Sequence, residues 1–253
     1  FEDRCLAVPR KMQVDNVVVK RSCYIELNTN VADNQRNLRD LKRLLASTCG
    51  DIRALNADVN DYDEQLSSII DSARPTLRTR PVILFDISVA ANRLLLRSLR
   101  VLLESLADLY IAYTEAEIYH PTEDEFNNDR TKWIGEDQLG TEIGVSSIVP
   151  SSKYAGQHLD PLPNCVVLFP SFRKERSLAV LSQVDETLVT NPRDNVIWIL
   201  GVPRDGANAW RTSAMKAINS IEQETPHHEL STFDYRATLA LLEQIYLDRW
   251  MEY

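Results

Sequence analysis

Glycine is scarce in this chain of 253 residues, which contains only seven. Phosphate-binding loops need clustered glycines, because the backbone must approach the phosphate closely. The sequence has neither the G-x-x-x-x-G-K-[ST] pattern of P-loop proteins nor the G-x-G-x-x-G pattern of dinucleotide-binding folds. It also lacks the G-x-S-x-G turn of α/β-hydrolases and the H-E-x-x-H pair of zinc proteases. These absences argue against the motif-defined enzyme classes, and we expect no bound cofactor.

Cysteine and histidine are also few, with four of each. None of the cysteines forms a C-x-x-C pair; they are Cys5, Cys23, Cys49 and Cys165. A chain of this length does not need disulfides, so we expect reduced thiols in a cytoplasmic protein. The histidines show no metal-ligand spacing, so no metal site is predicted. No apolar run approaches the ~20 residues of a membrane-spanning helix, so no membrane partner is expected.

Basic residues are in deficit, and the formal net charge is −9. Residues 1–111 carry 16 Lys and Arg against 15 Asp and Glu, whereas residues 112–253 carry 12 against 22. An acidic half repels the phosphate backbone, so we expect no binding to duplex nucleic acid. The chain opens at Phe1 without an initiator methionine and stops at Tyr253 directly after a helical pattern. We therefore expect a fragment of a longer protein.

Short apolar runs alternate with helical patterns along the chain. The continuous runs 81–85, 165–169 and 195–200 are typical of strands buried on both faces. This alternation predicts an α/β fold, with a mostly parallel Rossmann-like sheet and helices on both faces. We expect buried central strands to contain Phe85, Leu168 and Ile199. In the helix expected at about 91–107, the spacing predicts a core face made of Leu95, Leu99, Leu102 and Leu106.

We interpret residues 1–253 as one Rossmann-like α/β domain. Its halves, 1–114 and 160–253, are joined by an acidic excursion at 115–159 that contains several glycines and prolines. This composition predicts that the excursion is the most mobile and least buried part of the chain. The two halves could share one sheet or form two lobes.

Polar residues that follow the expected strands are the candidate site residues, because ligands of open parallel sheets bind beyond the carboxyl ends of the strands. After the strand at 81–85, a hydroxyl, an amide and a guanidinium begin a helix, where an anion could bind. Three cations begin the helix after 165–169, and their acidic partner could be a ligand phosphate or the acidic excursion. The candidate ligand-binding residues are Asp86, Ser88, Asn92, Arg93, Glu115, Ser171, Arg173 and Arg176. Further polar residues at strand ends are Arg204, Asp205, Ser231, Thr232, Asp234 and Tyr235.

A structural interpretation of the turn after 81–85 is equally open. Ser88 could cap the helix, Asp86 could pair with a neighbour, and Arg93 could be solvated. Arg93, Arg97 and Arg100 share one helix face, which predicts a solvated stripe. Arg97 lies one turn beyond Arg93, so the substitution Arg97→Ala is expected to have little effect on binding.

The segment 82–88 (VILFDIS), which runs into a helix with Asn92 and Arg93, resembles one unit of a known family. It is similar to the CARF and SAVED Rossmann-like sensor domains of prokaryotic antiviral systems. In that family an Asp-hydrophobic-Ser/Thr turn contacts a cyclic or linear nucleotide. Val89-Ala90-Ala91 stand where the family usually has glycines. The resemblance implies a nucleotide-sensing domain that acts in phage defence.

We therefore expect a ligand-sensing or regulatory domain of a larger cytoplasmic protein, which binds a nucleotide or another small anion. Other domains or subunits of the assembly would be its partners. One alternative is an enzyme acting on a nucleotide-like small molecule, with Glu115 or Asp86 as the acid or base. Another is a protein-interaction module that docks through its acidic second half.

Overall fold

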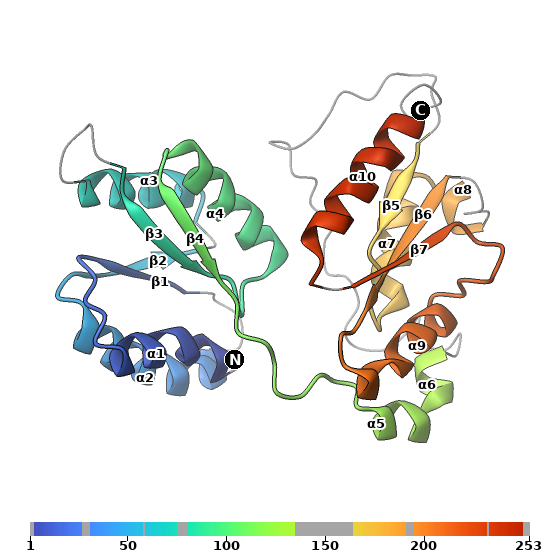
Figure 1. Cartoon of the computed structure of the whole chain (residues 1–253), viewed down its shortest axis with the longest axis horizontal. Helices are drawn as coiled ribbons and strands as arrows, with labels where there is room; N and C mark the ends of the chain where they lie inside the picture. Colours follow the sequence, from blue (N-terminus) through green and yellow to red (C-terminus); the bar gives the residue numbers. More distant parts are fainter. Residues whose placement is uncertain are drawn as a thin grey trace. The chain divides into compact units, whose positions relative to one another are not determined.

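A computed structural model describes residues 3–26, 31–57, 59–74, 80–134, 164–190, 195–231 and 233–249. The chain divides into two compact units, Phe1–Glu117 and Ile118–Tyr253. Every paired strand in the described ranges is parallel to its neighbour, and helices surround the sheets (Figure 1). The α/β prediction is therefore confirmed. The interpretation of the whole chain as one domain stays a prediction.

The first unit contains two parallel strand pairs, each joined by a helix. β1 pairs with β2 and β3 pairs with β4, with α2 and α4 as the connections. A parallel pair needs such a crossover, because the chain must return to the same end of the sheet. The elements are η1 (Asp3–Leu6), α1 (Ala7–Val14), β1 (Ser22–Glu26), α2 (Val31–Thr48), β2 (Ile52–Asn56), α3 (Tyr62–Ala73), β3 (Val82–Asp86), α4 (Asn92–Glu104) and β4 (Asp108–Ala112).

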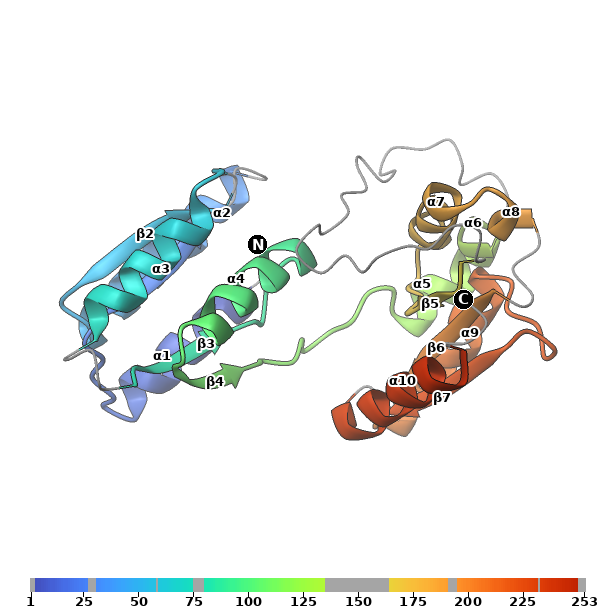
Figure 2. The ribbon, with the colours of Figure 1, turned by 90° about the horizontal axis from the view of Figure 1, so that it is seen from above.

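The main core of this unit lies where α3 and α4 pack side by side against the strands (Figures 1 and 2). Tyr62 is fully buried there, and its hydroxyl forms a 2.7 Å hydrogen bond with Ser98 Oγ. A smaller core joins η1 to α2 through Leu6 and Leu44. The main core consists of Leu55, Tyr62, Leu66, Ile70, Leu94, Val101 and Leu102.

β3 differs from the expectation of burial on both faces. Ile83 and Phe85 are partly buried against the core, but Val82 and Leu84 on the other face are 72% and 50% exposed. The apolar run does alternate in burial, because α3 and α4 cover only the face that carries Ile83 and Phe85. The prediction that Phe85 lies in a strand buried on both faces was therefore wrong.

α4 is rotated relative to the expected core face. Leu102 is buried as predicted, but Leu99 is half-buried and Leu106 is exposed beyond the end of the helix. Leucines occupy several faces of this helix, so the spacing fits more than one orientation. The observed orientation places Ser98 under Tyr62 and buries Leu94 in the core.

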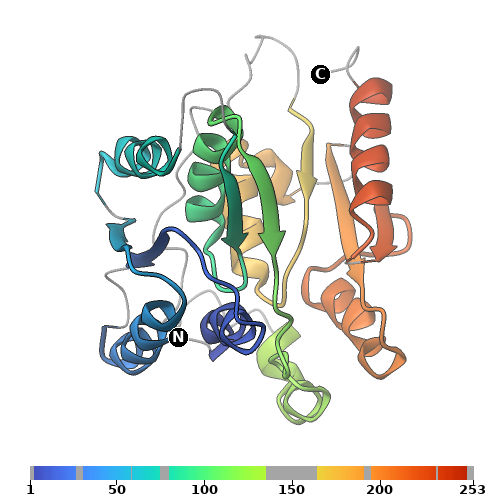
Figure 3. The same ribbon diagram turned by 60° about the vertical axis from the view of Figure 1, so that its left-hand side comes forward.

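The second unit is built around the three-stranded parallel sheet β5-β6-β7. Helices cover both faces of the central strand β6 (Figure 3). Trp198 packs on one face with residues of α7 and α8, whereas Ile199 packs on the other with Ile245 of α10. The elements are α5 (Glu123–Asn128), α6 (Arg130–Ile134), β5 (Val166–Leu168), α7 (Lys174–Val184), α8 (Thr187–Thr190), β6 (Val196–Val202), η3 (Gly206–Asn208), α9 (Trp210–Ile218), β7 (His227–Ser231) and α10 (Tyr235–Arg249).

β6 is buried on both faces, as its continuous apolar run predicted. Residues 196–200 are all buried, and Ile199 is only 2% exposed. Leu168 is half-buried instead, because β5 pairs with β6 alone and lies at the edge of the three-stranded sheet. The expectation of a buried central strand is thus confirmed for Ile199 and wrong for Leu168.

The start of the acidic excursion is helical. A reciprocal capping box between Thr122 and Glu125 begins α5, and Phe126 is buried against Ala214 and Ile218 of α9. Most of residues 122–134 are exposed, as that expectation requires, whereas their apolar side chains Phe126, Trp133 and Ile134 share one core with α9. The rest of the excursion, 135–159, lies outside the described residues.

Candidate functional site

The turn after β3 is held by its own side chains. Asp86 Oδ1 accepts hydrogen bonds from the Ser88 backbone N–H, at 3.0 Å, and from the Ser88 hydroxyl. Ser88 Oγ in turn accepts the N–H of Thr114 at 2.8 Å. Ser88 is only 4% exposed, so its hydroxyl faces the protein. These bonds fasten the end of β3 to the segment that follows β4.

The other candidates near this turn lie on the surface. Asn92 and Arg93, in the first turn of α4, are exposed, and so is Glu115 beyond β4. The N-cap of α4 is Ala91, and no side chain caps the helix. Asp86 and Ser88 are therefore hydrogen-bonded to each other. Ser88 does not cap α4, although the sequence allowed that role.

Arg97 does not belong to a solvated stripe. Its Nε lies 2.8 Å from Asp63 Oδ1, and its Nη1 donates to the carbonyl of Ala57 at 3.2 Å. The guanidinium also stacks 4.9 Å from the ring centroid of Tyr62. The prediction for Arg97 was wrong because its partners lie on α3 and on the segment after β2, far away in the sequence.

The candidates of the second unit surround the start of α7. Ser171 Oγ accepts the N–H of Arg173 at 3.2 Å, and the Ser171 carbonyl accepts Asn219 Nδ2 at 3.0 Å. Arg173 and Arg176 are exposed, and neither forms an ion pair within the described ranges. Whether a ligand or the excursion neutralises them stays open.

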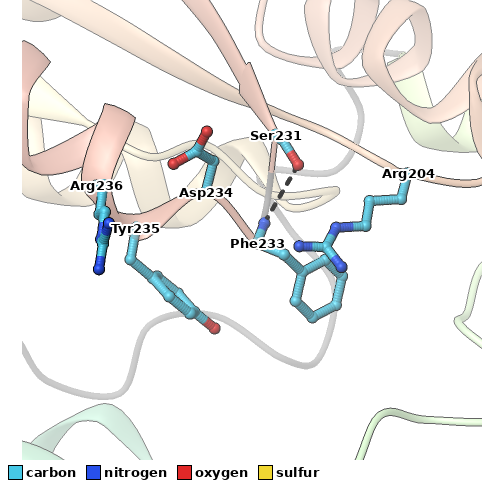
Figure 4. Close-up of a pocket in the computed structure, with 6 residues that line it drawn as sticks. All are labelled: Arg204, Ser231, Phe233, Asp234, Tyr235 and Arg236. Atoms are coloured by element: carbon cyan, nitrogen blue, oxygen red, sulfur yellow. Dashed lines mark hydrogen bonds between the residues drawn. The ribbon is translucent and has the colours of Figure 1, made fainter.

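A pocket of about 400 Å³ lies at the carboxyl ends of β6 and β7 (Figure 4). Four of its residues were noted from the sequence as strand-end residues but were not selected, and Phe233 and Arg236 were missed. The signal that could have selected them is the position of Arg204 and Arg236 after two successive strands. The pocket is lined by Arg204, Ser231, Phe233, Asp234, Tyr235 and Arg236.

The geometry of this pocket gives its groups different roles. The Arg204 guanidinium stacks 4.8 Å from the ring centroid of Phe233, whose N–H donates to Ser231 Oγ at 3.5 Å. Asp234 Oδ1 accepts the N–H of Ala237 at 2.9 Å, so this carboxylate caps the start of α10. Arg236 is exposed on another side of the pocket from Arg204 (Figure 4). Two guanidinium groups against one carboxylate make the pocket suitable for a small anion.

A second arginine site was not found from the sequence. Arg211 donates to the carbonyls of Tyr119 at 3.3 Å, His120 at 3.5 Å and Pro121 at 2.8 Å. Its guanidinium also lies within 5.7 Å of the ring centroids of Tyr119, Phe172 and Trp210. Burial lowers the pKa of Arg211 from its ordinary value. This side chain anchors the segment before α5, and we assign it a structural role.

The described residues contain no group of three or more His, Cys, Asp or Glu that could hold a metal ion. No described helix is long and apolar enough to cross a membrane.

No family model, curated protein or solved structure matches this chain.

Proposed function

We propose that this chain is a ligand-binding regulatory domain, and that it holds a nucleotide or a similar small anion in the pocket between the ends of β6 and β7. The observation that carries the proposal is the presence of Arg204 and Arg236 in one pocket beyond two parallel strands. Ligands of parallel α/β sheets bind at this end of the strands.

The chemistry of the pocket supports this class of ligand. A guanidinium offers a planar fork of donors that matches phosphate and carboxylate groups. Phe233 and Tyr235 supply aromatic surface for a base or another flat group. The volume of about 400 Å³ falls within the range of ~300–1,000 Å³ that is usual for small-molecule sites.

In this proposal the ligand does not contact the turn at 86–88. The resemblance to CARF and SAVED domains implies that this turn contacts the nucleotide, but the Ser88 hydroxyl is buried and bonded on both sides. A carboxylate acid or base in the pocket has less support, because Asp234 already caps α10. A role in antiviral defence rests on the resemblance alone and stays a prediction.

Isothermal titration with ATP, and separately with pyrophosphate, tests the proposal. We expect Arg204→Ala and Arg236→Ala each to weaken ATP binding by about tenfold or more, since a charge-assisted hydrogen bond contributes ~1.5–3 kcal/mol. Thermal stability should not change, because both side chains are exposed. Arg130→Ala, which removes an exposed guanidinium outside the pocket, is the matched control and should bind like the parent chain.

Two further variants distinguish this pocket from the candidates chosen from the sequence. Arg93→Ala tests the turn before α4, and Arg173→Ala tests the start of α7. If either of these weakens ATP binding while Arg204→Ala and Arg236→Ala do not, the ligand binds elsewhere and the proposal is wrong. Absence of binding to both ATP and pyrophosphate would also contradict it.

A further inference from the structure

Two aromatic side chains line the pocket at the ends of β6 and β7, and they differ in what their rings contact. The Phe233 ring is half-buried, and the Arg204 guanidinium lies over it at 4.8 Å from the centroid. The Phe233 backbone N–H donates to Ser231 Oγ at 3.5 Å, which ties the residue to the end of β7. Because a cation covers one face of a half-buried ring, Phe233 offers little surface to a flat ligand. Its ring instead holds the Arg204 side chain in the pocket.

Tyr235 is the other aromatic residue of the pocket, and its ring is open to solvent. It is the first residue of α10 and is 69% exposed. Within the described ranges its side chain has no ring contact, cation or hydrogen bond. In the view of Figure 4, the ring lies between Arg236 and the stack of Arg204 on Phe233. A flat group stacked on Tyr235 would therefore have guanidinium groups in the same pocket to bind an attached phosphate.

We propose that the pocket selects a nucleoside polyphosphate over inorganic phosphate, with the base stacked on Tyr235 and the phosphates bound by Arg204 and Arg236. This inference rests on the proposed function, because it assigns roles within the same pocket. Every base has a π face that can stack on tyrosine, whereas inorganic phosphate has none. Guanidinium groups bind phosphate oxygens through paired hydrogen bonds. Phe233 is a positioning residue, since it acts through Arg204 and not on the ligand.

Isothermal titration with ATP and with inorganic tripolyphosphate tests the role of Tyr235. The two probes contain the same number of phosphates, and only ATP has a base. We expect Tyr235→Ala to weaken ATP binding about 5- to 150-fold and to leave tripolyphosphate binding within about twofold of the parent chain. Tyr235→Phe keeps the ring and should bind both probes like the parent chain. Tyr246→Ala, at an exposed tyrosine of α10 outside the pocket, is the matched control and should not change ATP binding.

A second substitution, Phe233→Ala, tests the positioning role. It should weaken the binding of both probes by about two- to fivefold, because Arg204 loses the ring that holds it. In a chain that already contains Arg204→Ala, the same substitution should have no further effect on either probe. A merely structural role of Phe233 would instead add its own loss of affinity to that of Arg204→Ala.

The outcomes separate this inference from the proposed function. If Arg204→Ala and Arg236→Ala weaken ATP binding but Tyr235→Ala affects ATP and tripolyphosphate equally, the pocket binds an anion without contacting the base, and the inference is overturned. If Phe233→Ala weakens ATP binding and spares tripolyphosphate, the base stacks on Phe233, and the inference is wrong as well. If neither probe binds the parent chain, the proposed function fails together with the inference.

Discussion

Arg97 connects three segments of the first unit. Its guanidinium pairs with Asp63 on α3, donates to backbone carbonyls after β2, and stacks on Tyr62. Side chains of both ion-pair partners are less than a quarter exposed, so water screens this pair less than it screens a surface pair.

We expect Arg97→Ala to lower the free energy of unfolding by about 2 kcal/mol, because it removes hydrogen bonds from a charged group together with the ion pair to Asp63. Arg97→Lys should recover only part of this loss, because an ammonium cannot reproduce the fork or the stacking. Urea unfolding followed by circular dichroism measures both. Arg93→Ala in the same helix should change the free energy of unfolding by less than about 0.5 kcal/mol. An equal loss in the two alanine variants would contradict the stabilising role of the Arg97 contacts.

Individual polar residues were the least predictable part of the candidate site. The sequence correctly placed Ser88 in a turn after a strand, although Asp86 is the last residue of β3. It could not decide whether the Ser88 hydroxyl faces a ligand or the protein. That choice depends on Thr114, 26 residues away, whose N–H takes the acceptor site. The partner of Arg97 is 34 residues away, on another helix. Spacing within one helix contains no information about such contacts.

At the scale of elements, β6 and β3 show how similar apolar runs lead to different burial. β6 lies between β5 and β7 and carries helices on both faces. β3 pairs only with β4 among the described strands, and one of its faces is exposed. The run of apolar residues predicted both strands, but burial depends on the layers that tertiary packing adds.

Substitutions on the two strands should therefore differ in cost. We expect Ile199→Ala in β6 to destabilise the chain by about 2–5 kcal/mol, because it opens a cavity under α10. Leu84→Ala in β3 should cost less than about 1 kcal/mol, because that side chain is half exposed already. Denaturant titration of the two variants in parallel gives the comparison. Similar losses at the two positions would show that the exposed face of β3 is covered in solution.

The whole molecule consists of two units with separate hydrophobic clusters. The clusters around Leu55 and Leu6 belong to the first unit, and those around Trp198, Ile199 and Phe126 belong to the second. The sequence predicted the alternation of strands and helices but not η1 and α1, and it described 115–159 as an acidic excursion that joins the halves 1–114 and 160–253. The structure assigns the segment from Ile118 onwards to the second unit, because Arg211 and α9 bind it.

This boundary predicts how a fragment should behave. We expect the chain 118–253 to fold alone, since it contains its own clusters. A fragment that starts at Glu123 lacks the carbonyl acceptors and the Tyr119 ring that hold Arg211, and it should melt roughly 5–10 °C lower. Thermal unfolding by circular dichroism compares the two fragments. Equal melting temperatures would mean that the anchor contributes nothing to stability.

The burial of Trp198 in the β6 core has a spectroscopic consequence. All four tryptophans of the chain lie beyond Ile118, at positions 133, 198, 210 and 250. Selective excitation of indole therefore observes only the second unit, and Trp198 contributes blue-shifted emission because apolar side chains surround it. Unfolding of the first unit alone should therefore change the tryptophan emission little, because that unit contains no tryptophan. The amide circular dichroism signal in the far ultraviolet, in contrast, reports on both units. Tryptophan fluorescence and far-ultraviolet circular dichroism of one sample therefore distinguish unfolding of the second unit from unfolding of the first without an added dye.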